Sequence, residues 1–205
     1  MNATTNTEIQ TPSTFGAPFE DGFYGGKIRV GIAIFAIVWA PKAEGEIMGK
    51  WMDACTDVQG ATSYFDSMAN TRAMAESGSE IAKQALAVSI GGHTDWCIPA
   101  RDVLEMGYRY LKPSTKKNYC TFRDGDNPSS IPAGYPYTEN NPLQTTEDLF
   151  QKGNAEAFDE AIYFSSTQDS EGRAWVQFFD DGDQDYLIKA YERRCRFVRL
   201  IQLNT

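Results

Sequence analysis

Aromatic residues alternate with short polar residues in the last quarter of this chain and in the long loop before it. The residues that stand out are Asp169, Ser170, Trp175, Gln177, Gln184 and Tyr186, together with Tyr135 and Tyr137 among prolines. Aromatic faces supply contact area at low entropic cost, and short polar groups supply hydrogen bonds. This composition is typical of a surface that binds a sugar or a protein. The alternative is that the same aromatics pack beneath a loop-rich domain, and composition does not separate the two.

The residues that common catalytic sites need are scarce. His93 is the only histidine, and it stands between a glycine pair and a tryptophan, which favours a structural role. The sequence contains no P-loop and no G-x-S-x-G, G-x-G-x-x-G or H-E-x-x-H motif. The four cysteines, Cys55, Cys97, Cys120 and Cys195, form no close pair, so we expect free buried thiols and no zinc site. We therefore expect a protein that is not an enzyme and has no resident metal or cofactor.

Two acidic turns are the one feature that suggests a metal. The first contains Asp124, Asp126 and Asn127, and the second, 180–185, contains Asp180, Asp181, Asp183 and Asp185. Calcium requires several oxygen ligands that converge on one point. Neither turn matches an EF-hand loop, so solvated turns are expected and a calcium site is the alternative.

The length and charge of the chain limit its class. With 205 residues, 41% of them hydrophobic, it is long enough to form one domain with a packed core. A net charge of −9 disfavours nucleic acid and anionic membranes as partners. The longest apolar run, 30–40, is far shorter than the roughly 20 residues that span a bilayer. The first residues lack the basic start and apolar centre of a signal peptide, so we expect synthesis in a cytoplasm without export.

The pattern of elements predicts an α+β fold. Residues 1–25 are rich in Thr, Asn, Ser and Pro, which indicates a disordered tail or an extended arm that orders against a neighbouring subunit, followed by a domain over 26–205. Residues 27–40, KIRVGIAIFAIVWA, predict a bent strand or a hairpin that turns near Gly31.

Helices are expected over 70–88, with Ser79 as a plausible N-cap inside that stretch, and over 99–112. A long loop rich in Pro, Gly, Asn and Tyr follows over 113–151, and loops of this length are usually functional or disordered. Short strands are expected at 162–167, 174–179 and 195–203. The expected architecture is two helices packed on a small antiparallel sheet, with the last strands pairing with the 27–40 segment.

Four segments, taken in order, resemble the hallmarks of one domain family. These are Asn70-Thr71 before the first helix, GGHTDWCIPARDVL at 91–104, YFSSTQDSEGRAWVQFFDDG at 163–182, and RRCRFVRLI at 193–201. They are similar to the pattern of the family typified by the C-terminal domain of the Legionella collagen-like adhesin. The resemblance covers about residues 66–203 and implies a C-type-lectin-like fold, related to that of formylglycine-generating enzymes.

The sequence departs from the family pattern at several positions. Cys97 stands where Arg is usual, Ala100 where a capping Ser or Thr is usual, Val103 for Glu and Phe164 for Trp. A lost cap costs about 1 kcal/mol, so the fold is still expected. The Glu-Pro-Asn and Trp-Asn-Asp motifs of calcium-type lectins are absent, and so is the redox cysteine pair of the formylglycine-generating enzymes.

The resemblance implies a function. Members with a similar lone domain and a GKIRVG-like start are bacteriophage and prophage virion proteins, so we expect a non-enzymatic tail-fibre or tail-tip component in the virion that recognises a host-surface glycan or protein. Its expected partners are other virion proteins and a host receptor, and self-association, as a trimer, is implied by the adhesin. The alternative is a structural decoration or head-fibre protein that docks through its N-terminal arm. An enzyme of the formylglycine-generating type is a third hypothesis.

Overall fold

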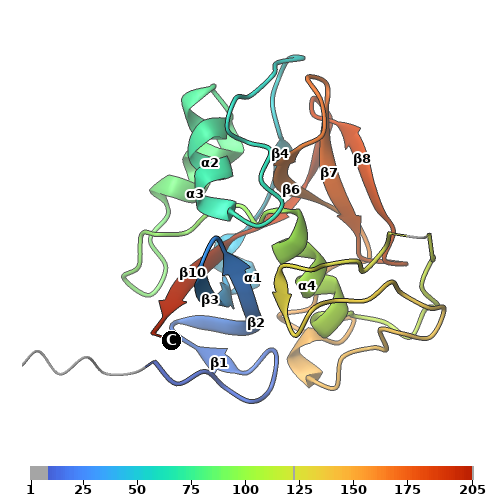
Figure 1. The fold of residues 1–205 in the computed structure, drawn as a ribbon. Coiled ribbons are helices and arrows are strands. Elements are labelled where there is room, and N and C mark those ends of the chain that lie inside the picture. Colours follow the sequence, from blue (N-terminus) through green and yellow to red (C-terminus); the bar gives the residue numbers. More distant parts are fainter. Residues whose placement is uncertain (1–8, 122, 205) are drawn as a thin grey trace, which may run out of the picture.

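The computed structural model describes residues 9–121 and 123–204, which form a mixed α+β fold (Figure 1). In this part of the chain the strands are β1 (Pro18–Phe19), β2 (Gly22–Val30), β3 (Ala33–Trp39), β4 (Glu46–Lys50), β5 (Ser130–Ile131), β6 (Ile162–Gln168), β7 (Arg173–Phe178), β8 (Gln184–Ile188), β9 (Glu192–Arg196) and β10 (Val198–Leu203). The helices are α1 (Lys42–Gly45), α2 (Ser67–Glu76), α3 (Glu80–Ala87), α4 (Arg101–Leu111) and the 3-10 turn η1 (Asp148–Phe150). The predicted α+β class is confirmed.

The strands form two five-stranded sheets that are antiparallel apart from one pair. The first has the order β1-β2-β3-β10, with β5 added to β2, and the second has the order β4-β9-β6-β7-β8. The parallel pair is β6 with β9. The predicted hairpin at 27–40 is confirmed as β2 and β3, which turn at Gly31 and Ile32 with a left-handed φ of 61° at Gly31. The predicted pairing of the last strands with this hairpin is confirmed for β10 alone, which pairs with β3 from Val198↔Trp39 to Leu203↔Ile34. The prediction of a single small sheet is wrong, because β6, β7 and β9 belong to the second sheet, and the strand expected at 195–203 is two strands, β9 and β10.

The single helix expected over 70–88 is wrong, because the segment forms two helices. The chain breaks at Gly78, whose φ of 105° is left-handed and open to glycine without strain. Ser79 does stand at the N-cap of α3, but its hydroxyl donates to the Trp51 carbonyl (2.6 Å) and caps nothing. With α1 and α4, the described part of the chain has four α-helices, and none of them is long and apolar enough to cross a membrane.

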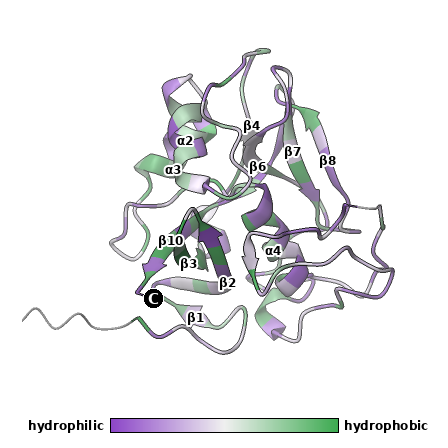
Figure 2. Cartoon of the chain, viewed as in Figure 1, coloured by the Kyte–Doolittle hydropathy of each residue, from purple (hydrophilic) through white to green (hydrophobic). Residues whose placement is uncertain are grey.

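Helix α4 ends as expected, just before Pro113, and it lies between the two sheets. It contacts β2 and β5 of the first sheet and β6 and β7 of the second. In Figure 2 the strand β3 is hydrophobic along much of its length, whereas α4 carries many hydrophilic residues. One core surrounds Trp39, Tyr108 and Phe179 against α4, and a second core surrounds Trp51 and Trp96 against α2 and α3. The hydrophilic residues of α4 are therefore enclosed by protein.

The four segments that carry the resemblance meet in space. The glycine pair forms a two-residue turn with left-handed φ at Gly91 (60°) and Gly92 (81°), closed by the Ile90–His93 bridge. After this turn, Asp95 accepts from Arg199 of β10 (2.6 Å), whose guanidinium also lies over the Trp96 ring.

Two side chains of α2 complete this set of contacts between the motif segments, which we call the frame. The Thr71 hydroxyl accepts from the Ile98 N–H (3.0 Å). The Asn70 amide donates to the Ser63 carbonyl (2.7 Å) and accepts from the Ser63 N–H (3.1 Å). The motif residues therefore join α2, the corner before α4 and the strands β6 and β10.

The N-terminal segment that the structure describes, 9–25, packs on its own chain. Strand β1 pairs with β2, and the Phe15 ring stacks on Tyr110 with centroids 3.6 Å apart. The expected boundary between residues 25 and 26 falls inside β2. Residues 1–8, the first part of the expected arm, lie outside the described residues.

Replacing Asn70 tests the frame. Asn70→Ala should lower the free energy of unfolding by about 1–2 kcal/mol, because the part-buried N–H of Ser63 loses its partner while the Ser63 carbonyl keeps only the Thr167 hydroxyl. Arg72→Ala, an exposed neighbour on the same helix, is the matched control and should unfold like the wild type. Equal midpoints of all three proteins in urea would show that this contact does not hold the frame.

Candidate functional site

The first turn of α4 is held by residues from other segments. Ala100, at its N-cap, has no side chain that can cap the helix. Instead the Ala100 N–H donates to the Ser67 hydroxyl (2.8 Å), the Arg101 N–H to the Thr167 hydroxyl (2.9 Å) and the Asp102 N–H to the Tyr64 carbonyl (2.8 Å). The orphan N–H groups of the helix are thus satisfied without the missing Ser or Thr.

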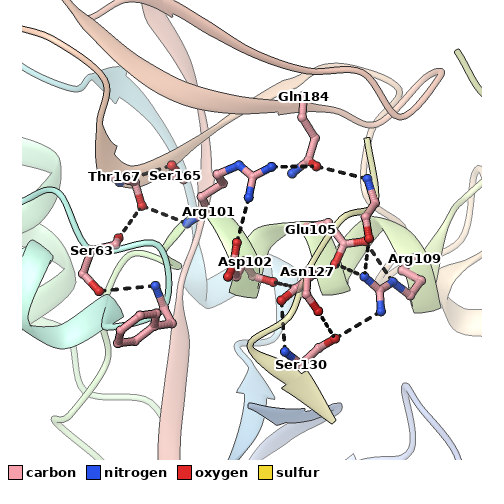
Figure 3. A network of polar contacts seen from close by, with 12 residues as sticks. Ser63, Arg101, Asp102, Glu105, Arg109, Asn127, Ser130, Ser165, Thr167 and Gln184 are labelled. Carbon is pink, nitrogen blue, oxygen red and sulfur yellow. Dashed lines mark hydrogen bonds and ion pairs between the residues drawn. The ribbon is translucent and has the colours of Figure 1, made fainter. Parts of the chain in front are cut away.

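Glu105, one turn further on, is a fully buried carboxylate with four hydrogen bonds, and Figure 3 draws those from Arg109 and Asn127. Two come from the Arg109 guanidinium (2.9 and 2.6 Å), one from the Asn127 amide (2.7 Å) and one from the Tyr137 hydroxyl (2.6 Å). Burial and the Glu105 charge raise the pKa of Tyr137 well above its usual value, so its hydroxyl stays a donor. Since Asn127 and Tyr137 belong to the 113–147 loop, Glu105 fixes that loop on α4.

Arg101 lies between two aromatic rings. Its guanidinium carbon is 5.0 Å from the centre of the Tyr64 ring and 4.9 Å from that of Trp175. Trp175 in turn meets Tyr186 edge to face at 5.5 Å, and the Arg173 guanidinium lies 4.4 Å from the centre of the Tyr186 ring. We call these five residues the aromatic–arginine stack. The contacts of Arg101 and Arg173 with these rings combine ring burial with cation–π attraction.

A cavity of about 730 Å³ opens beside this stack, and we call it the Arg101 cavity. Three segments line it, with Tyr64 and Phe65 before α2, Arg101 and Asp102 at the start of α4, and Arg123 and Asp126 in the 113–147 loop. Such a volume is in the range of small-molecule sites. Arg101 and Tyr64 belong to both the cavity and the stack, so the two form one candidate site.

Asp102 is the buried anion of this cavity. Its carboxylate accepts from Arg101 at 2.9 Å, and both side chains are almost fully buried. Burial raises the pKa of Asp102 to about 6, against the opposing effects of a hydrogen bond from Ser129 and of the Arg101 charge. Because the pair neutralises itself, neither charge is left alone in the interior.

Four of the residues predicted from sequence share one sheet face. Trp175 pairs with Tyr186 and Gln177 with Gln184 across β7 and β8. Trp175 and Tyr186 are partly exposed. Gln177 is buried and donates to the Gly182 carbonyl (2.8 Å), so its role is structural. The Gln184 amide oxygen accepts from Arg101 (3.4 Å) and from the Gly125 N–H (3.2 Å), which joins the sheet face to the loop.

The other predicted residues lie elsewhere. Asp169 and Ser170 are in the turn between β6 and β7, where Asp169 is 3.6 Å from Arg173. Tyr137 is buried against Glu105, whereas Tyr135 is 77% exposed beside Leu143 on a separate surface. The structure therefore does not bring Tyr135 and Tyr137 into the site.

Sequence reasoning missed Tyr64, Arg101 and Arg173. Arg101 lies in the 91–104 segment, which carries the family resemblance, and Tyr64 lies between residues 40 and 70, where the sequence predicts no element. The available signal was the alternation of β7, which places Arg173 two residues from Trp175 on the same face.

The acidic turns are occupied by protein donors. Asp124 is buried, and its two oxygens accept from the N–H groups of Gln184 (3.1 Å) and Thr121 (2.9 Å). Asp181 accepts from the Asp183 N–H (3.2 Å). In residues 9–121 and 123–204, no three acidic, histidine or cysteine side chains form a group that could hold a metal ion.

The cysteines and the histidine lie away from the candidate site. Cys97 and Cys195 are buried, which raises their pKa, whereas the prediction of burial is wrong for Cys55 and Cys120, which are exposed free thiols. His93 contacts Asp21 at 3.1 Å, at the turn between β1 and β2.

No family model matches this chain, and no curated protein or solved structure shows significant similarity to it. The site must therefore be interpreted from its own geometry.

Glu105→Ala should destabilise the protein by about 3–5 kcal/mol, because it leaves the Arg109 cation in the interior without its partner. Glu139→Ala removes the carboxylate of an exposed ion pair with Lys117 in the same loop and should unfold like the wild type. Urea unfolding measures both. A Glu105→Ala protein as stable as the Glu139→Ala protein would contradict the role given to Glu105.

The carboxyl group of Asp183 should make the stability of the fold depend on pH. Burial, and then the charges of Asp124, Asp185 and Asp181, raise its pKa to about 6 from the usual value of 3.8. A raised carboxyl pKa stabilises the fold below pH 3.8, and this contribution is lost as the pH rises through 6. Asp183→Asn should therefore gain stability relative to the wild type between pH 4 and 7, by about 1 kcal/mol after allowance for solvent screening. Asp183→Glu, which keeps a carboxylate, should retain the wild-type slope, and identical slopes in all three proteins would exclude the effect.

Proposed function

We propose that this chain is a non-enzymatic bacteriophage virion protein with a C-type-lectin-like fold, which recognises a molecule on the host surface from a tail fibre or tail tip. The observation that carries the proposal is the aromatic–arginine stack at the border of the Arg101 cavity. Partly exposed aromatic rings held by buried arginine are well suited to binding, because little side-chain entropy is lost when a ligand covers them.

Different residues connect the secondary-structure elements and line most of the cavity, and this supports the proposal. Several residues that resemble the adhesin family, such as Asn70, Asp95 and Trp96, connect secondary-structure elements, whereas Arg101 and Asp102 of the 91–104 motif line the cavity. The cavity is lined by loop residues and by the first turn of α4. A rigid frame below adaptable loops is a common design of recognition domains.

The alternative is a structural decoration or head-fibre protein that docks through its N-terminal arm. The described part of that arm, 9–25, is already engaged with its own domain through β1 and the Phe15–Tyr110 stack. We therefore favour recognition. Other virion proteins and further copies of the chain, as a trimer, remain the proposed partners in the particle.

Binding to host cells tests the proposal. Trp175→Ala should weaken saturable binding of the purified protein by at least about tenfold, because it removes the central ring of the stack. Tyr191→Ala, which removes an exposed ring outside the stack, is the control. Binding should persist in EDTA, and a loss there would return calcium to the mechanism. A folded wild-type protein that binds no better than Trp175→Ala would favour the structural alternative.

A further inference from the structure

The charges around the Arg101 cavity are balanced. Two guanidinium groups, of Arg101 and Arg123, share the walls with two carboxylates, of Asp102 and Asp126. Arg101 and Asp102 already form a buried ion pair at 2.9 Å. An anionic ligand would meet both carboxylates, and a cationic ligand would meet both guanidinium groups, so neither gains a net attraction inside the cavity.

The surroundings add to the barrier against anions. Two acidic turns, one with Asp124 and the other with Asp181 and Asp183, meet beside Gln184 of the site, and the whole chain carries a net charge of −9. The negative electrostatic potential of such a surface repels a negatively charged molecule that approaches it. The aromatic faces around Arg101 are already used by its own cation, which removes the usual attraction for a second cation.

The remaining walls combine apolar faces with hydroxyl groups. Phe65 is 36% exposed, Pro128 is exposed, and both line the cavity near Tyr64. Ser63 and Ser129 bring hydroxyl groups to the same space, and Asp126 brings an exposed carboxylate acceptor. A sugar ring has the complementary construction, with an apolar C–H face and hydroxyl groups that both donate and accept hydrogen bonds.

We infer that the Arg101 cavity binds an uncharged saccharide, with the apolar face of a sugar ring against Phe65 and Tyr64 and its hydroxyl groups toward Asp126 and Ser129. This inference rests on the proposed function and narrows its ligand to one chemical class. The recognition is independent of metal, because the donors are side chains of the protein. The balance between Arg123 and Asp126 sets the selectivity for uncharged sugars.

The test uses the full chain and three kinds of sugar, with binding measured by saturation-transfer NMR. The neutral probes are methyl glucoside, methyl galactoside and short N-acetylglucosamine oligomers, the acidic probes are galacturonate and N-acetylneuraminate, and the cationic probe is glucosamine. At least one neutral probe should bind saturably in EDTA, with an affinity at least about tenfold higher than any charged probe. Preference for an acidic or amino sugar, or no binding of any neutral probe, overturns the inference.

Variants locate the site. Phe65→Ala should reduce the affinity for the neutral probe by at least about tenfold, whereas Tyr191→Ala should leave it unchanged. Asp126→Asn leaves one uncompensated guanidinium at the rim and should shift selectivity toward galacturonate. Unfolding curves show whether each variant is folded. Unchanged affinity in Phe65→Ala, or unchanged selectivity in Asp126→Asn, contradicts the assignment.

The two proposals can fail separately. If host-cell binding is lost in Trp175→Ala but no neutral sugar binds, then recognition stands and the saccharide class is wrong. If a neutral sugar binds at Phe65 but cells are not bound, then the cavity is a sugar site and the role in host recognition is wrong.

Discussion

The fold depends on how α4 accommodates charge in the interior. This helix lies between two sheets, yet Arg101, Asp102 and Glu105 are all nearly inaccessible to solvent. A buried charge is tolerated only when partners surround it. Glu105 therefore draws Arg109, Asn127 and Tyr137 onto the helix, and this orders a loop whose composition alone would suggest disorder. The cavity exists because that loop is held a fixed distance from the segment before α2.

Several arginines are used internally, which explains how an acidic chain stays compact. Arg196 is fully buried against Glu156 and lies over the Phe158 ring, and Arg199 joins Asp95 to the C-terminal strand. Arg196 and Glu156 are 40 residues apart in the sequence, and Arg199 and Asp95 are 104 residues apart. Carboxylates such as Asp53 and Glu139 remain on the surface in exposed ion pairs, which contribute little to stability. Positive charge thus stabilises the interior, and the surface keeps the negative excess.

Frame and site are separate in this molecule but share an anchor. Thr167 of β6 accepts from the Arg101 N–H and donates to the Ser63 carbonyl, so one hydroxyl joins the frame to two walls of the cavity. The side chain of Asn70 holds Ser63 from the other side. Changes in Phe65, Arg123 or Asp126 can alter the ligand without touching these contacts. The geometry of the cavity is therefore set by the frame, and its chemistry by exposed loop residues.

The sequence by itself determined the α+β class, the turn at Gly31 and the end of α4 before Pro113, because each follows from local periodicity, glycine or proline. It placed the start of this helix at residue 99, whereas α4 begins at Arg101. It misplaced the break at Gly78, where a single residue with left-handed φ outweighed a continuous helical pattern. Only the tertiary structure decided that Tyr137 and Gln177 are buried and that Arg101 lies between Tyr64 and Trp175. Those positions depend on partners far away in the chain, and a buried polar group takes its role from the partner that satisfies it.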